Sequence, residues 1–227
     1  MIQVNHYLFY YFIFVLCLLY NYIKLIKLLS IIYNIMSICD FANINNIVKE
    51  EKIQLCVISY GGSCSGLLVN TLEKNGYLIH TRTWASILCH CPEYINLDIP
   101  IIYIYDNIIK SYLSVKNRGT GWYDVNQQKL SNNYNVELSD ENLLSLMIKQ
   151  YNSWTEKKDK NVLIIKSNEL FEGSILEKLQ TFLKNPSLQY FPIKFITPKT
   201  NINNMEEKDL LLFQKYKDEI DKINSTL

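Results

Sequence analysis

Residues 57–68 read Val-Ile-Ser-Tyr-Gly-Gly-Ser-Cys-Ser-Gly-Leu-Leu, and this stretch determines the fold that we expect. Its apolar start is typical of a buried strand, and Leu67, Leu68 and Leu72 recur at the spacing of a helix. The small residues between them predict a tight loop. Loops of this kind bind phosphate in many proteins, because backbone N–H groups and the positive end of the helix dipole face the anion.

The residues of this loop exclude one common class of phosphate site. In a P-loop NTPase the last glycine is followed by Lys and then Ser or Thr, whereas Gly66 is followed by two leucines. A tight strand–helix turn that binds nothing is the simpler interpretation. If the loop does bind an anion, the candidate binding residues are Gly61, Gly62, Ser63, Cys64, Ser65 and Gly66.

The composition fits one globular domain with a sizeable core, since the chain has 227 residues. A formal net charge of +1 argues against bulk attraction to nucleic acid, so we predict no nucleic-acid partner. The 6 cysteines are too scattered for a small disulfide scaffold. Cys89-His90-Cys91 has poor chelating geometry and lacks a second ligand cluster, so we predict no metal.

The N-terminal segment favours a membrane anchor. Residues 7–23 are almost all aliphatic or aromatic, and this run is near the lower length limit for spanning a bilayer. Lys24 and Lys27 follow the run, so the positive-inside tendency favours a globular part in the cytosol. The alternative is a segment that does not span a membrane, with a cytoplasmic protein.

Shifts in composition divide the chain into three parts. We assign residues 1–36 to the hydrophobic segment, 37–52 to a linker and 53–227 to an α/β domain. The sequon Asn224-Ser225-Thr226 is weak support for a lumenal location, because it lies at a chain end that we expect to fray.

Strand-like and helix-like segments alternate through the third part. Short apolar runs predict strands at residues 53–58, 77–80, 99–105 and 161–166. Helical spacing predicts helices at residues 65–75, 107–117, 138–157, 173–184 and 205–223, with Ser139 and either Asp106 or Asn107 as N-caps. This alternation predicts a three-layer α/β/α fold with a mostly parallel central sheet. Ligands of such sheets bind at the carboxyl ends of strands, here residues 60–66 and 105–108.

Three segments resemble, in order, motifs of the sulfotransferase family. Residues 59–68 are similar to the family's 5′-phosphosulfate loop, residues 102–114 to its 3′-phosphate strand and helix, and residues 162–170 to a later strand and turn. The resemblance covers about residues 53–185. It implies a P-loop NTPase-like sulfotransferase fold, 3′-phosphoadenosine 5′-phosphosulfate as donor co-substrate, and a hydroxyl acceptor, a carbohydrate by analogy with membrane-bound members. Ser114 matches the family's 3′-phosphate serine.

Two positions depart from the family pattern. The family has Lys or Arg where this chain has Gly62, and Arg where it has Asp106, which reverses the charge. The long cationic side chains that we expect to replace them are Lys110, Lys116, Arg118 and Arg82. The alternative is that these residues are simply solvated.

His80 is the candidate catalytic base, because it lies at the predicted carboxyl end of the second strand. His90 and Glu93 are further candidates, and each of the three is also compatible with an ordinary polar residue at a strand end or in a loop. Two other function classes stay open. One is a nucleotide- or anion-binding module that has lost catalysis, and the other is a membrane-tethered interaction protein.

Overall fold

The computed structural model describes residue 24 and residues 44–79, 89–91, 93–117, 137, 139–157, 159–172, 174–189 and 205–226. The predicted anchor at residues 7–23, the candidate base His80 and the candidate cations Arg82 and Arg118 lie outside these residues. No helix within the described residues combines the length and the apolar composition needed to cross a bilayer. All elements named below belong to the compact unit Asn43–Leu227.

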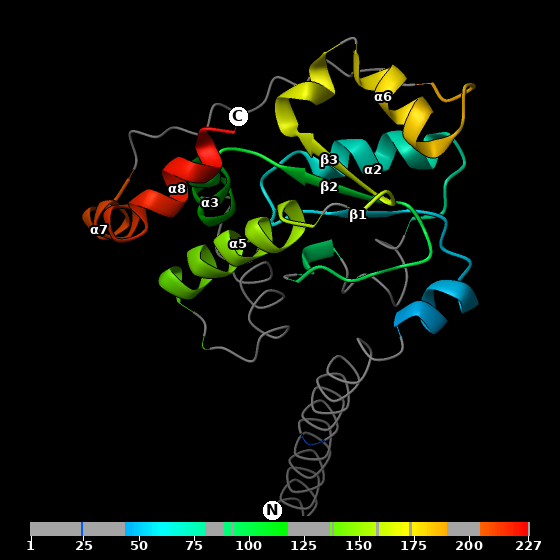
Figure 1. Cartoon of the computed structure of the whole chain (residues 1–227). Helices are drawn as coiled ribbons and strands as arrows, with labels where there is room; N and C mark the ends of the chain where they lie inside the picture. The colour runs from blue at the N-terminus through cyan, green and yellow to red at the C-terminus, as the bar shows by residue number, and fades with distance from the viewer. Residues whose placement is uncertain are drawn as a thin grey trace, which may run out of the picture. The chain divides into compact units, whose positions relative to one another are not determined.

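A parallel sheet of three strands lies at the centre of this unit (Figure 1). The strands are β1 (Cys56–Ile58), β2 (Ile101–Tyr105) and β3 (Val162–Lys166), in the order β1-β2-β3. Val57 is opposite Ile102, and Ile102 is opposite Leu163. The parallel α/β sheet predicted from the alternating pattern is confirmed, and its strands are apolar because helices cover both faces.

The predicted strand at residues 77–80 is represented among the described residues by a single parallel bridge between Leu55 and Ile79. The N–H group of the next residue, Cys56, donates to the Pro100 carbonyl beside β2, at 3.0 Å. In the parallel register that pairs Cys56 with Ile101, Pro100 occupies the position beside Leu55 on the β2 edge. Ile79 therefore lies on the edge of β1 that faces away from β2, and the order of the sheet reverses at β1.

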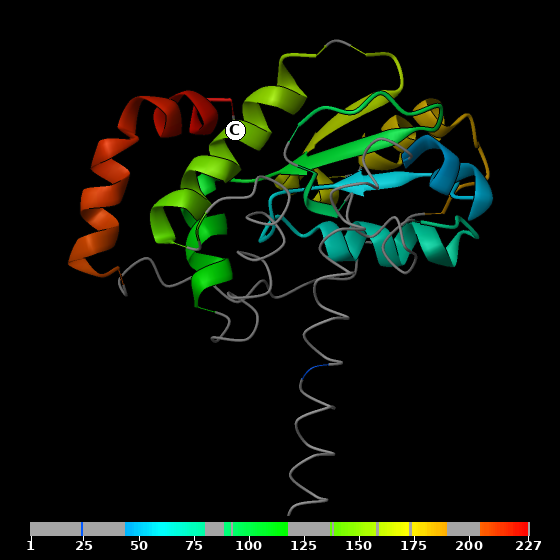
Figure 2. The same cartoon turned by 90° about the horizontal axis from the view of Figure 1, so that it is seen from below.

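Helices pack on both faces of the sheet (Figures 1 and 2). On one face, α2 (Ser65–Lys74) and α6 (Ser174–Leu183) share a buried apolar cluster with strand residues such as Ile102 and Ile104. On the other face, the Tyr103 ring stacks on Trp154 of α5 (Asp140–Thr155), with ring centroids 5.9 Å apart. Alternate residues of β2 thus contact different helical layers, as strand geometry requires.

The predicted helix ends are confirmed where local capping chemistry sets them. Asn107 is the N-cap of α3 (Ile108–Lys116), and its side chain accepts a hydrogen bond from the Lys110 N–H at 3.0 Å. Ser139 caps α5 in the same way, accepting from the Asn142 N–H at 3.1 Å. Gly76, just after α2, has a φ of 87°, the left-handed conformation that a glycine in this position adopts readily.

Two segments differ from the sequence-based expectation. Residues 44–50 form a helix with Ile44 and Val48 buried, where we expected a linker. The predicted C-terminal helix consists of two helices, α7 (Glu207–Lys215) and α8 (Lys217–Asn224), which meet at an angle at Tyr216 (Figure 2). Tyr216 leaves the helical region, with φ −106° and ψ 26°, and its hydroxyl donates to Glu141 of α5 at 3.2 Å.

Candidate functional site

The candidate site lies where the β1–α2 loop (residues 59–64) meets the β2–α3 junction. Tyr60 is fully buried, and its hydroxyl donates to the Asp106 carbonyl and accepts from the Asp106 N–H at 2.9 Å. Burial raises the pKa of this hydroxyl well above its ordinary value. Because the sheet order reverses at β1, these two carboxyl ends flank a topological switch point, where open α/β sheets bind ligands.

Left-handed residues give the β1–α2 loop its shape. Gly61 and Gly62 have φ values of 94° and 69°, and Cys64, the N-cap of α2, has a φ of 61°. Ser59 supports the turn, since its hydroxyl accepts from the Gly61 N–H at 3.3 Å and donates to the Ser65 hydroxyl at 3.1 Å. A left-handed non-glycine residue costs about 1–2 kcal/mol. Strain of this kind is often kept at ligand-binding loops, and turns with this backbone direct N–H groups toward anions.

Gly62 allows the loop to contact α3. A Cβ atom at this position would lie 2.8 Å from the Ser111 carbonyl oxygen and 2.9 Å from the Ser111 Cα. A lysine here, as in the family pattern, would need both this space and an unfavourable left-handed backbone. The departure at Gly62 is therefore a packing requirement of this loop, and position 62 supplies no cation.

The hydroxyls of the loop differ in their environments. Ser63 is fully buried, and its Oγ has no hydrogen-bond partner among the described residues. Ser65 is partly buried and is paired with Ser59, as described above. Gly66 is exposed, with no atom within 4 Å of the position that a Cβ would occupy. A buried polar atom without a partner is costly, so Ser63 is the loop residue with most to gain from a bound acceptor.

The N-terminus of α3, expected to bind a 3′-phosphate, is already capped by protein oxygens. The Asp106 carboxylate accepts from the Asn107 N–H at 2.6 Å, and the Asn107 side chain accepts from the Lys110 N–H. The Asn224 side chain, from the end of α8, accepts from the Ile108 N–H at 3.2 Å. A phosphate can reach these N–H groups only by displacing a protein acceptor, and it would also face the negative charge of Asp106.

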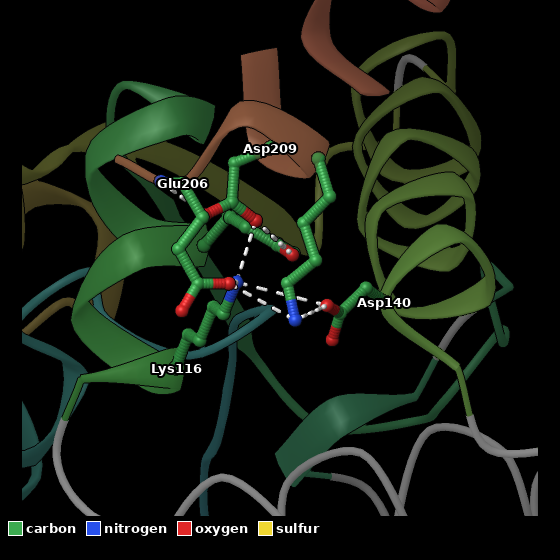
Figure 3. A network of polar contacts seen from close by, with 6 residues as sticks. Lys116, Asp140, Glu206 and Asp209 are labelled. Carbon is green, nitrogen blue, oxygen red and sulfur yellow. Dashed lines mark hydrogen bonds and ion pairs between the residues drawn. The ribbon is translucent and has the colours of Figure 1, made fainter. Parts of the chain in front are cut away.

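Lys116, one of the cations expected to replace the missing phosphate cation, lies in an ion-pair cluster with three carboxylates. Its Nζ lies 2.6 Å from Asp209 and 3.3 Å from Glu206, at the start of α7, and 3.6 Å from Asp140 of α5 (Figure 3). Asp209 is buried and also accepts from the Tyr112 hydroxyl at 3.1 Å. The Lys116 charge is neutralised within this cluster, which joins α3, α5 and α7.

The other residues expected to bind the 3′-phosphate lie on α3 or outside the described residues. Lys110 is exposed in the first turn of the helix, and Ser114 is partly buried in the second. Arg118 follows the described end of this region. The structure therefore places Ser114 and Lys110 on the expected helix.

The structure brings His90 to the loop. Its Nδ1 lies 2.6 Å from the Ser59 carbonyl oxygen, and the Ser59 N–H donates to the Cys89 carbonyl at 3.0 Å. A carbonyl oxygen only accepts, so Nδ1 carries the proton and Nε2 of the neutral ring is the basic nitrogen. Glu93, the third candidate base, forms an ion pair with Lys149 at 2.8 Å.

The cysteines near the sheet are free thiols in the described residues. Burial raises the pKa of Cys56 well above its ordinary value and raises that of Cys91 to about 12, so both are protonated at neutral pH. The Cys91 carbonyl accepts from the side chains of Gln150 and Trp154, each at 2.9 Å. No group of three or more His, Cys, Asp or Glu side chains in the described residues is arranged to hold a metal ion.

Sequence reasoning missed Tyr60, Ser111 and Asn224 as parts of this site. Tyr60 lies within the quoted loop, but nothing local indicates a partner at Asp106, 46 positions away. Asn224 contacts Ile108 across 116 positions, and its sequon gives no indication of this contact. Such contacts exist only once the tertiary fold brings these segments together.

Comparisons with models of protein families, with characterised proteins and with solved structures gave no match.

Proposed function

We propose that this protein is a divergent sulfotransferase-like protein that binds 3′-phosphoadenosine 5′-phosphosulfate at the carboxyl ends of β1 and β2. The observation that carries the proposal is the β1–α2 loop, with its left-handed residues and the buried Ser63 hydroxyl just before α2, which has no partner among the described residues. The backbone N–H groups of residues 62–66, with Ser63 and Ser65, would hold the 5′-phosphosulfate. Bound there, the donor supplies a sulfuryl group for a hydroxyl acceptor, for which we propose a carbohydrate.

This chain's own residues would then position the reactants and accept a proton. A base must take the proton of the acceptor hydroxyl, and we retain His80 for this role, with His90 as the alternative because it contacts Ser59. The hydrogen bonds between the Tyr60 hydroxyl and the Asp106 backbone would hold the β1–α2 loop and the β2–α3 junction in fixed positions relative to each other. Positioning of this kind supplies much of the rate in the related transfer of phosphoryl groups.

A binding module without transferase activity is the second candidate. Two observations favour it: position 62 has no room for a cation, and Lys116 is held in an ion-pair cluster. Loss of one such charge-stabilising group lowers the rate by roughly 10²–10³-fold. The two candidates share the donor site and differ only in the chemical step.

Calorimetric titration with 3′-phosphoadenosine 5′-phosphate, the desulfated product, tests the shared site. We expect micromolar binding by the full chain, and Ser63→Ala should weaken it by about tenfold or more, since a hydrogen bond to a charged group is lost. The same change should leave the free energy of unfolding unchanged or slightly higher, because none of the described residues is a hydrogen-bond partner of this hydroxyl. Ser187→Ala, in an exposed turn, is the matched control.

The outcomes separate the function classes. Binding together with transfer of labelled sulfate from the donor to a panel of hydroxyl acceptors supports the enzyme. Binding without transfer supports the module. A folded protein that binds no nucleotide refutes the donor site and leaves the membrane-tethered interaction protein, whose predicted anchor is residues 7–23.

A further inference from the structure

The end of the chain is packed over the β2–α3 junction. Ile220 and Ile223 of α8 are buried, and α8 contacts α3 and α5. Beyond the Asn224 cap on Ile108, the Thr226 hydroxyl lies 2.9 Å from the Tyr151 hydroxyl. The C-terminus lies near the tip of β2 in both views (Figures 1 and 2). We call residues 224–226 the latch.

We infer that the latch competes with the 3′-phosphate of the nucleotide and so blocks the 3′-phosphate end of the donor site, an inference that rests on the proposed function. The argument is one of shared donors: the Asn224 oxygen already accepts from the Ile108 N–H, in the first turn of α3. A phosphate oxygen that binds this N–H group must displace the Asn224 oxygen. The latch and a 3′-phosphate bound at this N–H group therefore exclude each other.

A second observation points to the same place. The Tyr103 hydroxyl is completely buried and has no hydrogen-bond partner among the described residues. Its electrostatic neighbours are the tyrosines Tyr60, Tyr105 and Tyr151, and the hydroxyls of the last two also contact Thr226 of the latch. The unpartnered Tyr103 hydroxyl thus shares two tyrosine neighbours with the latch.

The latch is held weakly enough to act as a switch. Among the described residues, the polar contacts of the latch to other segments are the Asn224 cap and the contacts of the Thr226 hydroxyl with Tyr105 and Tyr151. Ser225 and Thr226 are exposed. A site that must first open binds with an affinity reduced by the fraction of open molecules. Removing one neutral hydrogen bond of the latch should therefore raise nucleotide affinity by about three- to tenfold.

Two nucleotides that differ only in the 3′-phosphate test this inference on the full chain. Calorimetry should show that Asn224→Ala and Thr226→Val increase the affinity for 3′-phosphoadenosine 5′-phosphate. The affinity for adenosine 5′-phosphate should not change, because it has no 3′-phosphate to compete. Asn224→Asp should have the opposite effect, since its negative charge caps α3 better and repels phosphate. Asn46→Ala, at an exposed helical position, is the control.

Each outcome has a distinct meaning. Equal affinities of the wild type, Asn224→Ala and Thr226→Val for 3′-phosphoadenosine 5′-phosphate, with binding still measurable, overturn the latch and leave the donor site standing. If the variants fold, as circular dichroism shows, and neither nucleotide binds to any of them, the proposed function itself fails. An equal rise for both nucleotides means that the end of the chain affects the whole site, and it overturns competition with the 3′-phosphate.

Discussion

Replacing Gly62 by alanine tests the contact on which the shape of the candidate site depends. The added Cβ would lie 2.8 Å from the Ser111 carbonyl oxygen, in a residue whose φ is 69°. The left-handed backbone costs an L-residue about 1–2 kcal/mol. Overlap with a backbone that is fixed within α3 adds about 1–3 kcal/mol, as in overpacked cores. Alanine also lowers the entropy of the unfolded chain, and this offsets about 0.4–1 kcal/mol of the loss. We therefore expect Gly62→Ala to lower the free energy of unfolding by about 1–4.6 kcal/mol.

Urea unfolding followed by far-ultraviolet circular dichroism measures this change, with Gly66→Ala as the matched control. Gly66 is helical and exposed, and a Cβ there meets nothing within 4 Å. The control should therefore stabilise the protein by about 0.5–1 kcal/mol through helix propensity. Two identical changes four positions apart should thus shift the midpoint in opposite directions, with similar m-values. A loss at Gly62 below about 1 kcal/mol, or equal shifts for both variants, would refute the close approach of loop and helix.

Two further predictions concern the surroundings of the site. Lys116→Met should cost about 3 kcal/mol of unfolding free energy, because it leaves the buried Asp209 carboxylate without its cation. Lys217→Met, which breaks a solvent-exposed pair with Asp221, should change the free energy of unfolding far less. Equal losses for the two variants in urea unfolding would contradict this reasoning. Burial raises the pKa of the Cys91 thiol from its ordinary 9.0 to about 12. As the pH rises, this thiol therefore loses its proton in the unfolded chain before it does so in the folded protein. The free energy of unfolding should then fall between pH 9 and pH 12. Cys91→Ala should make that fall shallower in unfolding experiments between pH 9 and pH 12, and an unchanged slope would exclude the thiol as a cause.

The features that could be predicted from the sequence are those with local causes. The buried strands have runs such as Ile101 to Tyr105, and the helix ends have capping side chains such as Asn107 and Ser139. Hydrophobic spacing and capping act over a few residues, so they remain visible in the sequence. The bend at Tyr216 lacks such a signal, because no proline or glycine interrupts the helical pattern there. It coincides instead with the contact between Tyr216 and Glu141, 75 positions away.

The sequence predicts where the candidate site lies, but it does not predict which side chains contact one another there. The loop lies at the carboxyl end of β1, as expected, with Gly61 and Gly62 in left-handed conformations. The sequence does not reveal that Lys116 binds Asp209 or that Asn224 caps α3, since each pair joins segments more than 90 positions apart. A lysine one helical turn from a predicted site cannot be assigned to that site from sequence alone, because a distant segment can supply a nearer carboxylate, as Asp209 does for Lys116.

The two departures from the family pattern are better explained together than as separate losses. Gly62 permits contact with Ser111. Asp106 binds Tyr60 through its backbone and the N–H of Asn107, the N-cap of α3, through its carboxylate. Each residue thus takes part in the same junction between loop and helix. If the departures were independent losses, restoring one cation would recover part of the function. Since they share one packing arrangement, Gly62→Lys should destabilise the protein at least as much as Gly62→Ala and should not increase nucleotide affinity. An increase in affinity from that single change would show that the loop has space for the cation after all.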